Sequence, residues 1–137
     1  MRKPIYPYRK HQHSCFLLQY HLVLVTKYRH PVLDNDISEF LLNYTKSYFK
    51  ERNVRLLEIN TNKDHIHILF EGTPTLFLSQ FINAFKSASA RHIRQEYGES
   101  LKQYYWKPYF WSNSYFISTV SDVTESVVSE YIKNQKE

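Results

Sequence analysis

The sequence predicts an α+β protein in which one antiparallel sheet carries helices on one face. Its 137 residues fit one domain and are too few for two independent cores of ordinary size. Hydrophobic residues make up 42% and charged residues 23% of the chain, a balance that can fill a core. Strand-like and helix-like segments follow one another in the order β-α-β-β-α-β, with a further helix at the end. We therefore expect a single domain over residues 1–137.

The first half of the chain contains three predicted strands and one helix. Residues 16–26 are rich in β-branched and aromatic side chains, which is typical of a strand. The run Asp34-Asn35-Asp36 offers a helix cap, and apolar residues then recur every three or four positions until Arg52. Residues 54–60 and 65–70 are two further strand-like runs, joined by a polar loop that suits a hairpin.

The second half contains two predicted helices and one strand. Apolar residues keep helical spacing over residues 76–97, and Gly98 supplies the expected stop. An irregular aromatic stretch at 101–111 precedes a short strand at 115–120. The last helix covers residues 122–135 and begins with an Asp-x-x-Glu capping pattern. This order is the split βαβ, or ferredoxin-like, arrangement, which RNA-recognition domains also adopt.

Positive charge is concentrated at the N-terminal end of the chain. Residues 1–33 hold six basic side chains and no acidic one, whereas the rest of the chain holds 12 basic and 13 acidic side chains. With a pI near 9.2, this distribution indicates a polyanionic partner that contacts the N-terminal end. Nucleic acid is the first candidate. We expect residues 1–14 to form a basic tail.

Nine basic residues are candidate phosphate contacts. They are Arg2, Lys3, Arg9, Lys10, Lys27 and Arg29 near the N-terminus, and Lys86, Arg91 and Arg94 on the second helix. For the three helix residues, a solvated helix face is an equally good interpretation. The aromatic residues at 104–111 could stack on unpaired bases, but core or dimer packing is favoured because large aromatic side chains are usually buried.

Several classes of protein are disfavoured by the composition. The longest apolar stretch is far shorter than the roughly 20 residues that span a bilayer, so we expect no membrane association. The basic N-terminus is not followed by the apolar run of a secretory signal. Cys15 is the single cysteine, which excludes an internal disulfide and a cysteine-based zinc cluster. These features predict a reducing compartment, the cytoplasm.

The stretch Asp64-His65-Ile66-His67-Ile68 is the strongest candidate for a chemical site. On a strand, alternate side chains point to opposite faces, so His65 and His67 would share one face while the isoleucines enter the core. The two histidines would lie about 7 Å apart at their Cα atoms and could converge on one metal ion. The motif alone is weak, because a second His-x-His pair occurs at 11 and 13, where solvated or phosphate-contacting roles are favoured.

A metal site with two histidines needs further ligands. Gln135 could supply a carbonyl oxygen, which would give a mixed nitrogen and oxygen site suited to Mn²⁺ or Mg²⁺. Tyr131 lies one helical turn before Gln135, on the same face. A tyrosine hydroxyl beside such a cation can act as a nucleophile toward phosphorus. The alternative is that Tyr131, like most of the 12 tyrosines, is a packing residue.

Four stretches together resemble the HUH-type single-tyrosine transposases of prokaryotic insertion sequences. They are Val25-Thr-Lys27-Tyr28-Arg29, Asp64-His65-Ile66-His67, Trp111-Ser-Asn-Ser-Tyr115-Phe116 and Tyr131-Ile-Lys-Asn-Gln135. They follow the family's order over nearly the whole chain. One position departs from the pattern: Ser121 stands where the family commonly has a glycine hinge before the tyrosine helix.

The resemblance implies an enzyme that cuts and rejoins single-stranded DNA with a divalent metal ion. His65, His67 and Gln135 match the metal ligands, and Tyr131 matches the nucleophile that forms a 5′-phosphotyrosine bond. The family works as a homodimer that binds hairpins at the ends of the element, and its tyrosine helix can complete the active site of the other subunit. No general base for the tyrosine is visible in the sequence.

Two other functions fit the same residues. A non-catalytic nucleic-acid-binding module is compatible with the order of elements, although the aromatic signature of RNA-recognition domains is absent. A domesticated relative of the transposase that processes chromosomal hairpins is the second alternative.

Overall fold

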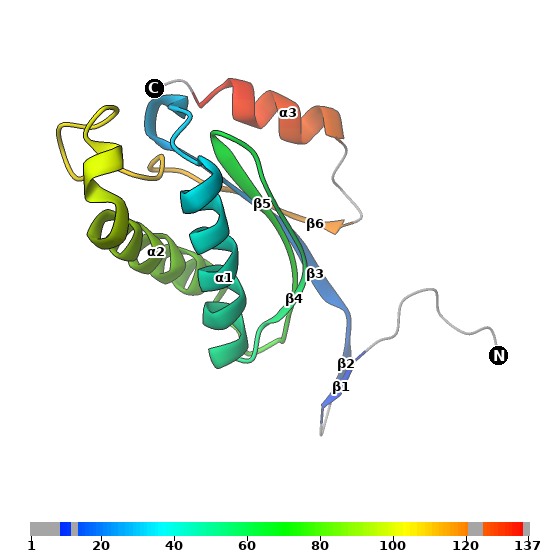
Figure 1. The fold of residues 1–137 in the computed structure, drawn as a ribbon. Coiled ribbons are helices and arrows are strands. Elements are labelled where there is room, and N and C mark those ends of the chain that lie inside the picture. The colour runs from blue at the N-terminus through cyan, green and yellow to red at the C-terminus, as the bar shows by residue number, and fades with distance from the viewer. Residues whose placement is uncertain (1–8, 12–13, 121–124, 136–137) are drawn as a thin grey trace.

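The computed structural model describes residues 9–11, 14–120 and 125–135, and Figure 1 traces their arrangement. The strands are β1 (Arg9–His11), β2 (Ser14–Phe16), β3 (Leu18–Val25), β4 (Arg55–Thr61), β5 (His65–Gly72) and β6 (Phe116–Thr119). The helices are α1 (Asn35–Glu51), α2 (Leu78–Leu101) and α3 (Glu125–Lys133), with a short 3₁₀ turn at Lys27–Arg29.

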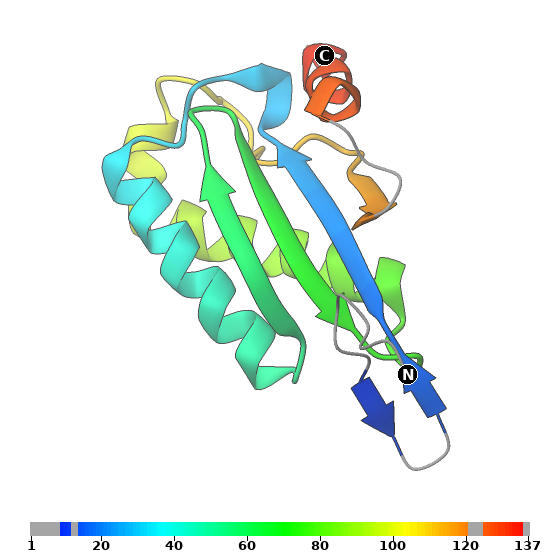
Figure 2. The same cartoon turned by 90° about the vertical axis from the view of Figure 1, so that its right-hand side faces the viewer.

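The main sheet has four strands in the order β4-β5-β3-β6, and every neighbouring pair is antiparallel. Helices α1 and α2 cover one face of this sheet, and α3 lies on the opposite side, near the C-terminal end of β3 (Figures 1 and 2). This arrangement confirms the predicted α+β, ferredoxin-like class. The sheet therefore has one face covered by two helices and one face that meets only α3 among the described helices.

The N-terminal segment differs from the tail that we expected over residues 1–14. Residues Arg9–His11 pair antiparallel with Ser14–Phe16 in a separate two-stranded sheet, so part of the predicted tail is a hairpin. The long predicted strand at 16–26 is accordingly divided between β2 and β3. Backbone pairing between residues so close in sequence costs little loop entropy, which explains why a basic segment can still form strands.

The predicted α1 and the β4–β5 hairpin agree closely with the structure. Asp34 caps α1, because its Oδ1 accepts a hydrogen bond from the Ile37 backbone N–H at 2.9 Å. The helix ends at Glu51, one residue before the predicted end. Strands β4 and β5 pair antiparallel, with a register shift between Leu56 and Glu58.

The predicted end of α2 is wrong. The helix continues through Gly98 to Leu101, although Tyr97 departs from helical geometry with φ −125° and ψ 28°. Gly98 does not have a positive φ, so its special freedom is not used to stop the helix. The added turn buries Leu101, which is 5% exposed. Burial of a leucine offsets the roughly 1 kcal/mol that a glycine costs within a helix.

The C-terminal helix ends at Lys133, two residues before the predicted end at 135. Helix α3 spans Glu125–Lys133, and Gln135 follows its end in a turn closed by a hydrogen bond from the Gln135 N–H to the Ile132 carbonyl. The expected capping pattern at Asp122 and the Ser121 hinge position lie outside the described residues. Among the described helices, none is long and apolar enough to span a membrane.

Phe49 lies at the centre of the core between the sheet and the two covering helices. Its ring meets those of Phe70, Phe81 and Phe85 edge to face, with centroid distances of 5.5, 5.0 and 5.6 Å. All three partners lie on other elements, β5 and α2. Phe49 therefore joins α1 to both the sheet and α2.

Replacing Phe49 with alanine should lower the free energy of unfolding by about 3 to 5 kcal/mol, because it removes a fully buried ring and leaves a cavity. Urea unfolding followed by circular dichroism measures this loss. The matched control is Phe77→Ala, since the Phe77 side chain is 77% exposed and should contribute within about 0.5 kcal/mol. Equal effects of the two substitutions would contradict this view of the core.

Candidate active site

Strand β5 presents its two histidines on the face opposite α1 and α2. Ile66 and Ile68 are fully buried in the core beneath those helices, and the intervening His65 and His67 are only partly buried. This alternation agrees with the predicted orientation. In the register of the sheet, His65 lies opposite Val25 of β3 and His67 lies opposite Val23. Each histidine therefore lies in a row of cross-strand neighbours, at the same level in adjacent strands, that continues onto β3.

His65 is oriented by an acidic neighbour. Its Nδ1 lies 2.8 Å from Asp64 Oδ1, and Arg29 Nε donates to the other Asp64 oxygen at 3.0 Å. Burial alone would raise the pKa of Asp64, but the hydrogen bonds and charges of His65 and Arg29 outweigh it and lower that pKa. This contact leaves Nε2 of His65 for another partner. Arg29, a predicted phosphate contact, thus gives one N–H to Asp64.

His67 makes a contact that the sequence did not predict. Its Nε2 lies 2.8 Å from Nδ1 of His21 on β3, and the two rings stack with centroids 5.0 Å apart. Burial, followed by the charge of His21, lowers the pKa of His67. The neutral imidazole, which a low pKa favours, is the form that binds metal ions. His21 and Val23 are two residues apart on β3, so their side chains lie on the same face of the sheet. The sequence alone does not show that His21 lies beside His67, because that contact depends on the register between β3 and β5.

Tyr131 reaches the same face from α3. Its ring packs on Phe116 of β6 with centroids 5.3 Å apart, and Phe116 lies in the row formed by Val23 and His67. The Tyr131 hydroxyl lies 3.1 Å from Ser114 Oγ. Burial raises the pKa of Tyr131, and the hydrogen bond with Ser114 partly opposes that shift. Tyr131 is therefore a protonated, hydrogen-bonded phenol on the histidine face.

Gln135 is held by two serine hydroxyls. Its Oε1 accepts hydrogen bonds from Ser112 Oγ and Ser114 Oγ, each at 3.0 Å. The backbone N–H of Ser112 in turn donates to the carbonyl of Val25 at 2.7 Å, and Val25 is the pairing partner of His65. Ser112, which binds the amide of Gln135, and His65 are therefore both backbone neighbours of Val25 on β3.

Ser112 and Ser114 were not singled out as functional residues from the sequence. They lie between the predicted irregular stretch at 101–111 and the predicted strand at 115–120, within the sequence Trp111-Ser-Asn-Ser-Tyr115. The only sequence signal for a functional role of these residues is the alternation of hydroxyl side chains at 112 and 114. Their contacts with Tyr131 and Gln135 become visible only in the structure. We refer to residues 112–114 below as the serine segment.

The donor groups at this face fit a divalent cation of mixed nitrogen and oxygen preference. Within the described part of the chain, no cluster of three His, Cys, Asp or Glu side chains could hold a metal ion. The candidate metal-binding groups are therefore the imidazoles of His65 and His67 and the amide oxygen of Gln135. A neutral His67, an oriented His65 and a carbonyl oxygen suit Mn²⁺ or Mg²⁺ better than a closed zinc site.

The basic residues near the N-terminus that were predicted to contact phosphate lie in different parts of the chain. Arg2 and Lys3 lie outside the described residues, and Arg9 and Lys10 lie on β1. Lys27 Nζ lies over the rings of Tyr28 and Tyr109, at 5.2 and 5.3 Å from their centroids. Each of these positions, where described, remains compatible with a predicted DNA contact.

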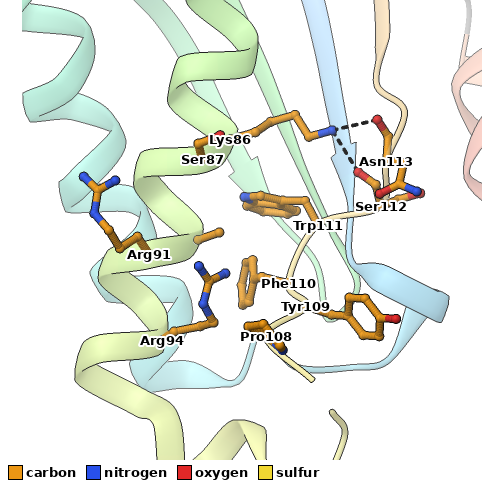
Figure 3. Close-up of a pocket in the computed structure, with 11 residues that line it drawn as sticks. Lys86, Ser87, Arg91, Arg94, Pro108, Tyr109, Phe110, Trp111, Ser112 and Asn113 are labelled. Carbon is orange, nitrogen blue, oxygen red and sulfur yellow. Dashed lines mark hydrogen bonds between the residues drawn. The ribbon is translucent and has the colours of Figure 1, made fainter. Parts of the chain in front are cut away.

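All three candidates on α2, Lys86, Arg91 and Arg94, line a groove beside the irregular segment. Arg91 and Arg94, with Pro108 and Tyr109, border this groove of 440 Å³ (Figure 3). The Lys86 ammonium donates hydrogen bonds to the backbone carbonyls of Ser112, Asn113 and Ser114. The aromatic residues nearby mostly pack, as favoured: Tyr105, Phe110 and Trp111 are buried, while Trp106 is 85% exposed.

Replacing Asp64 with asparagine should lower the free energy of unfolding by about 1 to 3 kcal/mol at pH 7, because Arg29 loses its charged partner. The lowered pKa of Asp64 means that its contribution is present above the unfolded pKa of about 3.9 and is lost as pH falls through the folded pKa. The difference between wild type and variant should therefore shrink below about pH 4.

Urea unfolding at pH 7 and at pH 3 measures this difference. Glu39→Gln is the control, because Glu39 is an exposed carboxylate on α1. A difference between wild type and Asp64→Asn that is the same at both pH values would contradict the assignment.

The chain is similar to known proteins over most of its length. A family model described as "Transposase IS200 like" matches residues 14–135. The ISDra2 transposase TnpA of Deinococcus radiodurans is 32% identical over 120 residues, which cover 88% of this chain and 85% of that protein. The transposase for insertion sequence element IS200 of Salmonella typhimurium is 30% identical over 125 residues, covering 91% and 81% of the two chains.

Solved structures have the same fold. The crystal structure of a candidate transposase from Deinococcus radiodurans R1 superposes with a TM-score of 0.86 and 32% identity, covering 93% of this chain and 97% of that chain. A REP-associated tyrosine transposase bound to a REP hairpin has a TM-score of 0.57 at 9% identity, covering 96% and 68% of the two chains, and shares the fold alone. From the family match over residues 14–135 and these relatives, the chain belongs to the IS200-like family of transposases.

Proposed function

We propose that this protein is a metal-dependent transposase that cleaves and rejoins single-stranded DNA at the ends of an insertion sequence. The observation that supports this proposal is the meeting of three separate segments on one face of the sheet. Strand β5 brings His65 and His67, and the end of the chain brings Tyr131 and Gln135. The serine segment lies between the end of the chain and β3.

Tyr131 is the proposed nucleophile. Its hydroxyl oxygen attacks a scissile phosphorus and forms a phosphotyrosine bond to the 5′ side, while the bond to the 3′ oxygen breaks and that oxygen leaves as a free hydroxyl with a proton. The covalent bond keeps the energy of the phosphodiester. A 3′ hydroxyl of another DNA end can therefore reverse the step and join a new strand without a nucleotide cofactor.

The surroundings of Tyr131 suit a nucleophile that is protonated before the reaction. Burial raises the pKa of its hydroxyl, so the phenol needs a partner to accept its proton at neutral pH. The Ser114 hydroxyl, at 3.1 Å, orients the phenol and can share in its hydrogen bonding. Packing of the Tyr131 ring on Phe116 fixes the direction of the side chain.

His65, His67 and Gln135 are the proposed ligands of Mg²⁺ or Mn²⁺. Asp64 orients His65, and burial keeps His67 in the neutral form by lowering its pKa. A bound divalent cation would neutralise charge on the phosphate oxygens. The contribution of the chain itself is to hold two imidazoles and an amide oxygen on the same face as the Tyr131 hydroxyl.

The proposed DNA partner is single-stranded DNA with hairpins at the element ends. Lys27 and Arg29 lie directly after β3, next to Asp64 and the histidines, where they can contact phosphates. A structural neighbour is described as bound to a REP hairpin, which makes a hairpin the first form of DNA to test. The proposal includes a homodimer, in which the tyrosine helix serves its own subunit or the other one.

Tyr131→Phe should abolish formation of a covalent protein–DNA adduct, because it removes the attacking oxygen and leaves the ring packing on Phe116 intact. The assay incubates the protein and Mn²⁺ with a single-stranded oligonucleotide from an element end, and adducts are separated on a denaturing gel. Tyr44→Phe is the matched control, because Tyr44 packs with Phe85 and His92 on the helix-covered side. An adduct that persists in Tyr131→Phe, or that wild type never forms with cognate DNA, would contradict the proposal.

Removal of divalent metal with EDTA should lower adduct formation by at least about 100-fold, and added Mn²⁺ or Mg²⁺ should restore it. The double variant His65→Ala, His67→Ala should stay inactive after metal is added, because both imidazole ligands are gone. Titration calorimetry with Mn²⁺ alone measures metal binding independently of activity. Undiminished Mn²⁺ binding by the double variant would exclude these histidines as ligands.

A further inference from the structure

Lys86 extends from α2 toward the serine segment. Its Nζ donates to the carbonyls of Ser112, Asn113 and Ser114, at 2.8, 3.1 and 3.4 Å (Figure 3 shows the first two contacts). A lysine ammonium has three N–H donors, so these contacts use all of them. Burial lowers the pKa of Lys86, and no carboxylate pairs with it among the described residues. Lys86 is therefore a partly buried cation that is satisfied by backbone oxygens.

The backbone that Lys86 binds is the same backbone that holds the candidate catalytic groups. Ser112 and Ser114 bind Gln135 Oε1, and Ser114 also binds the Tyr131 hydroxyl. The carbonyls of this segment thus face Lys86, and its hydroxyls face α3. One short piece of chain connects a helix on the covered face of the sheet to the tyrosine on the other face.

The start of the serine segment is anchored separately. The Trp111 Nε1–H donates to Ser89 Oγ on α2 at 3.0 Å, and the Ser112 N–H donates to the Val25 carbonyl at 2.7 Å. Asn113 and Ser114 are exposed and extend beyond these anchors. Lys86 contacts this exposed part as well as Ser112, so it restricts the portion of the segment that carries the Ser114 hydroxyl.

We infer that Lys86 is a positioning residue for Tyr131 and Gln135, acting through Ser112 and Ser114, and is not a contact to DNA. The inference rests on the proposed function of Tyr131. Three carbonyl oxygens that converge on one point require a donor with several N–H groups and positive charge, which the ammonium supplies. Without it, the segment would exchange these bonds for water and would fix the two hydroxyls less tightly.

The first test compares Lys86→Met with wild type in the adduct assay. The variant should form adduct about 10- to 100-fold more slowly at saturating oligonucleotide, because small displacements of reacting groups have effects of that size. The dissociation constant for the oligonucleotide should stay within about twofold, since phosphate contacts are not removed. Lys86→Arg, which keeps the charge and several donors, should recover part of the rate.

Lys46→Met is the matched control. It removes one positive charge and the same N–H donors from an exposed position of α1. It should change neither rate nor affinity appreciably. If Lys86→Met instead weakens oligonucleotide binding several-fold and reacts at the wild-type rate when saturated, Lys86 is a DNA contact and the inference is wrong.

A double-variant cycle tests the route through the serine segment. If Lys86 acts through Ser114, Lys86→Met should reduce the rate much less in a Ser114→Ala background than in wild type. A general loss of stability would instead add to the effect of Ser114→Ala. Full additivity of the two substitutions would overturn the proposed route.

Hydrogen exchange separates this inference from the proposed function. Amides of α3 at 128–133 should exchange faster in Lys86→Met than in wild type, while those of α1 should be unchanged. This measurement needs no DNA and no metal. If wild type forms no adduct, the proposed function fails, and exchange still decides whether Lys86 supports the docking of α3. Equal exchange of α3 in both proteins would overturn the inference, and Lys86→Gln replaces Lys86→Met if the latter does not fold.

Discussion

The antiparallel register between β3 and β5 is the constraint on which the rest of the structure depends. It sets Leu22 and Leu24 beside Ile68 and Ile66 on the helix-covered face. The same register sets Val23 and Val25 beside the histidines on the other face. Because the side-chain period of a strand is two residues, a fold that buries the apolar residues must display His65 and His67. The core and the candidate site are therefore two outcomes of one pairing.

The two faces of the sheet are held by different kinds of contact. On the covered face, α1 and α2 pack through a continuous aromatic and aliphatic core around Phe49. On the other face, the contacts of α3 and of Gln135 just after it include the packing of Tyr131 on Phe116 and the hydrogen bonds of Tyr131 and Gln135 with two serines. The covered face is thus held mainly by apolar packing, whereas the contacts of Tyr131 and Gln135 on the other face include several polar ones. Tyr131, the proposed nucleophile, is held there through both its ring and its hydroxyl.

The elements that the sequence predicted well are those with a local pattern. The α1 stripe, its Asp34 cap and the alternation around His65 and His67 depend on neighbours within a few positions, so they can be read from spacing. Gly98 misled the prediction because burial of Leu101, a tertiary effect, decided where α2 ends. The contact of His21 with His67 and the role of the serine segment depend on strand register and on the position of α3. No local pattern determines those. The proposed roles of Tyr131 and Gln135 came from their helical spacing and from the family resemblance, and the fold brings both to the histidine face.

The hydrogen bond between His21 and His67 has a consequence for the tautomer of His67, a proposed metal ligand. A hydrogen bond between two neutral imidazoles requires one ring to donate and the other to accept. When His21 Nδ1 accepts, the proton of His67 stays on Nε2, and Nδ1 of His67 keeps a free lone pair. The opposite arrangement would put the proton on Nδ1 and leave His67 without a nitrogen to offer a cation. A residue of the neighbouring strand thereby decides which nitrogen of His67 keeps a free lone pair, and the proposed binding of a cation becomes linked to the pairing of the sheet.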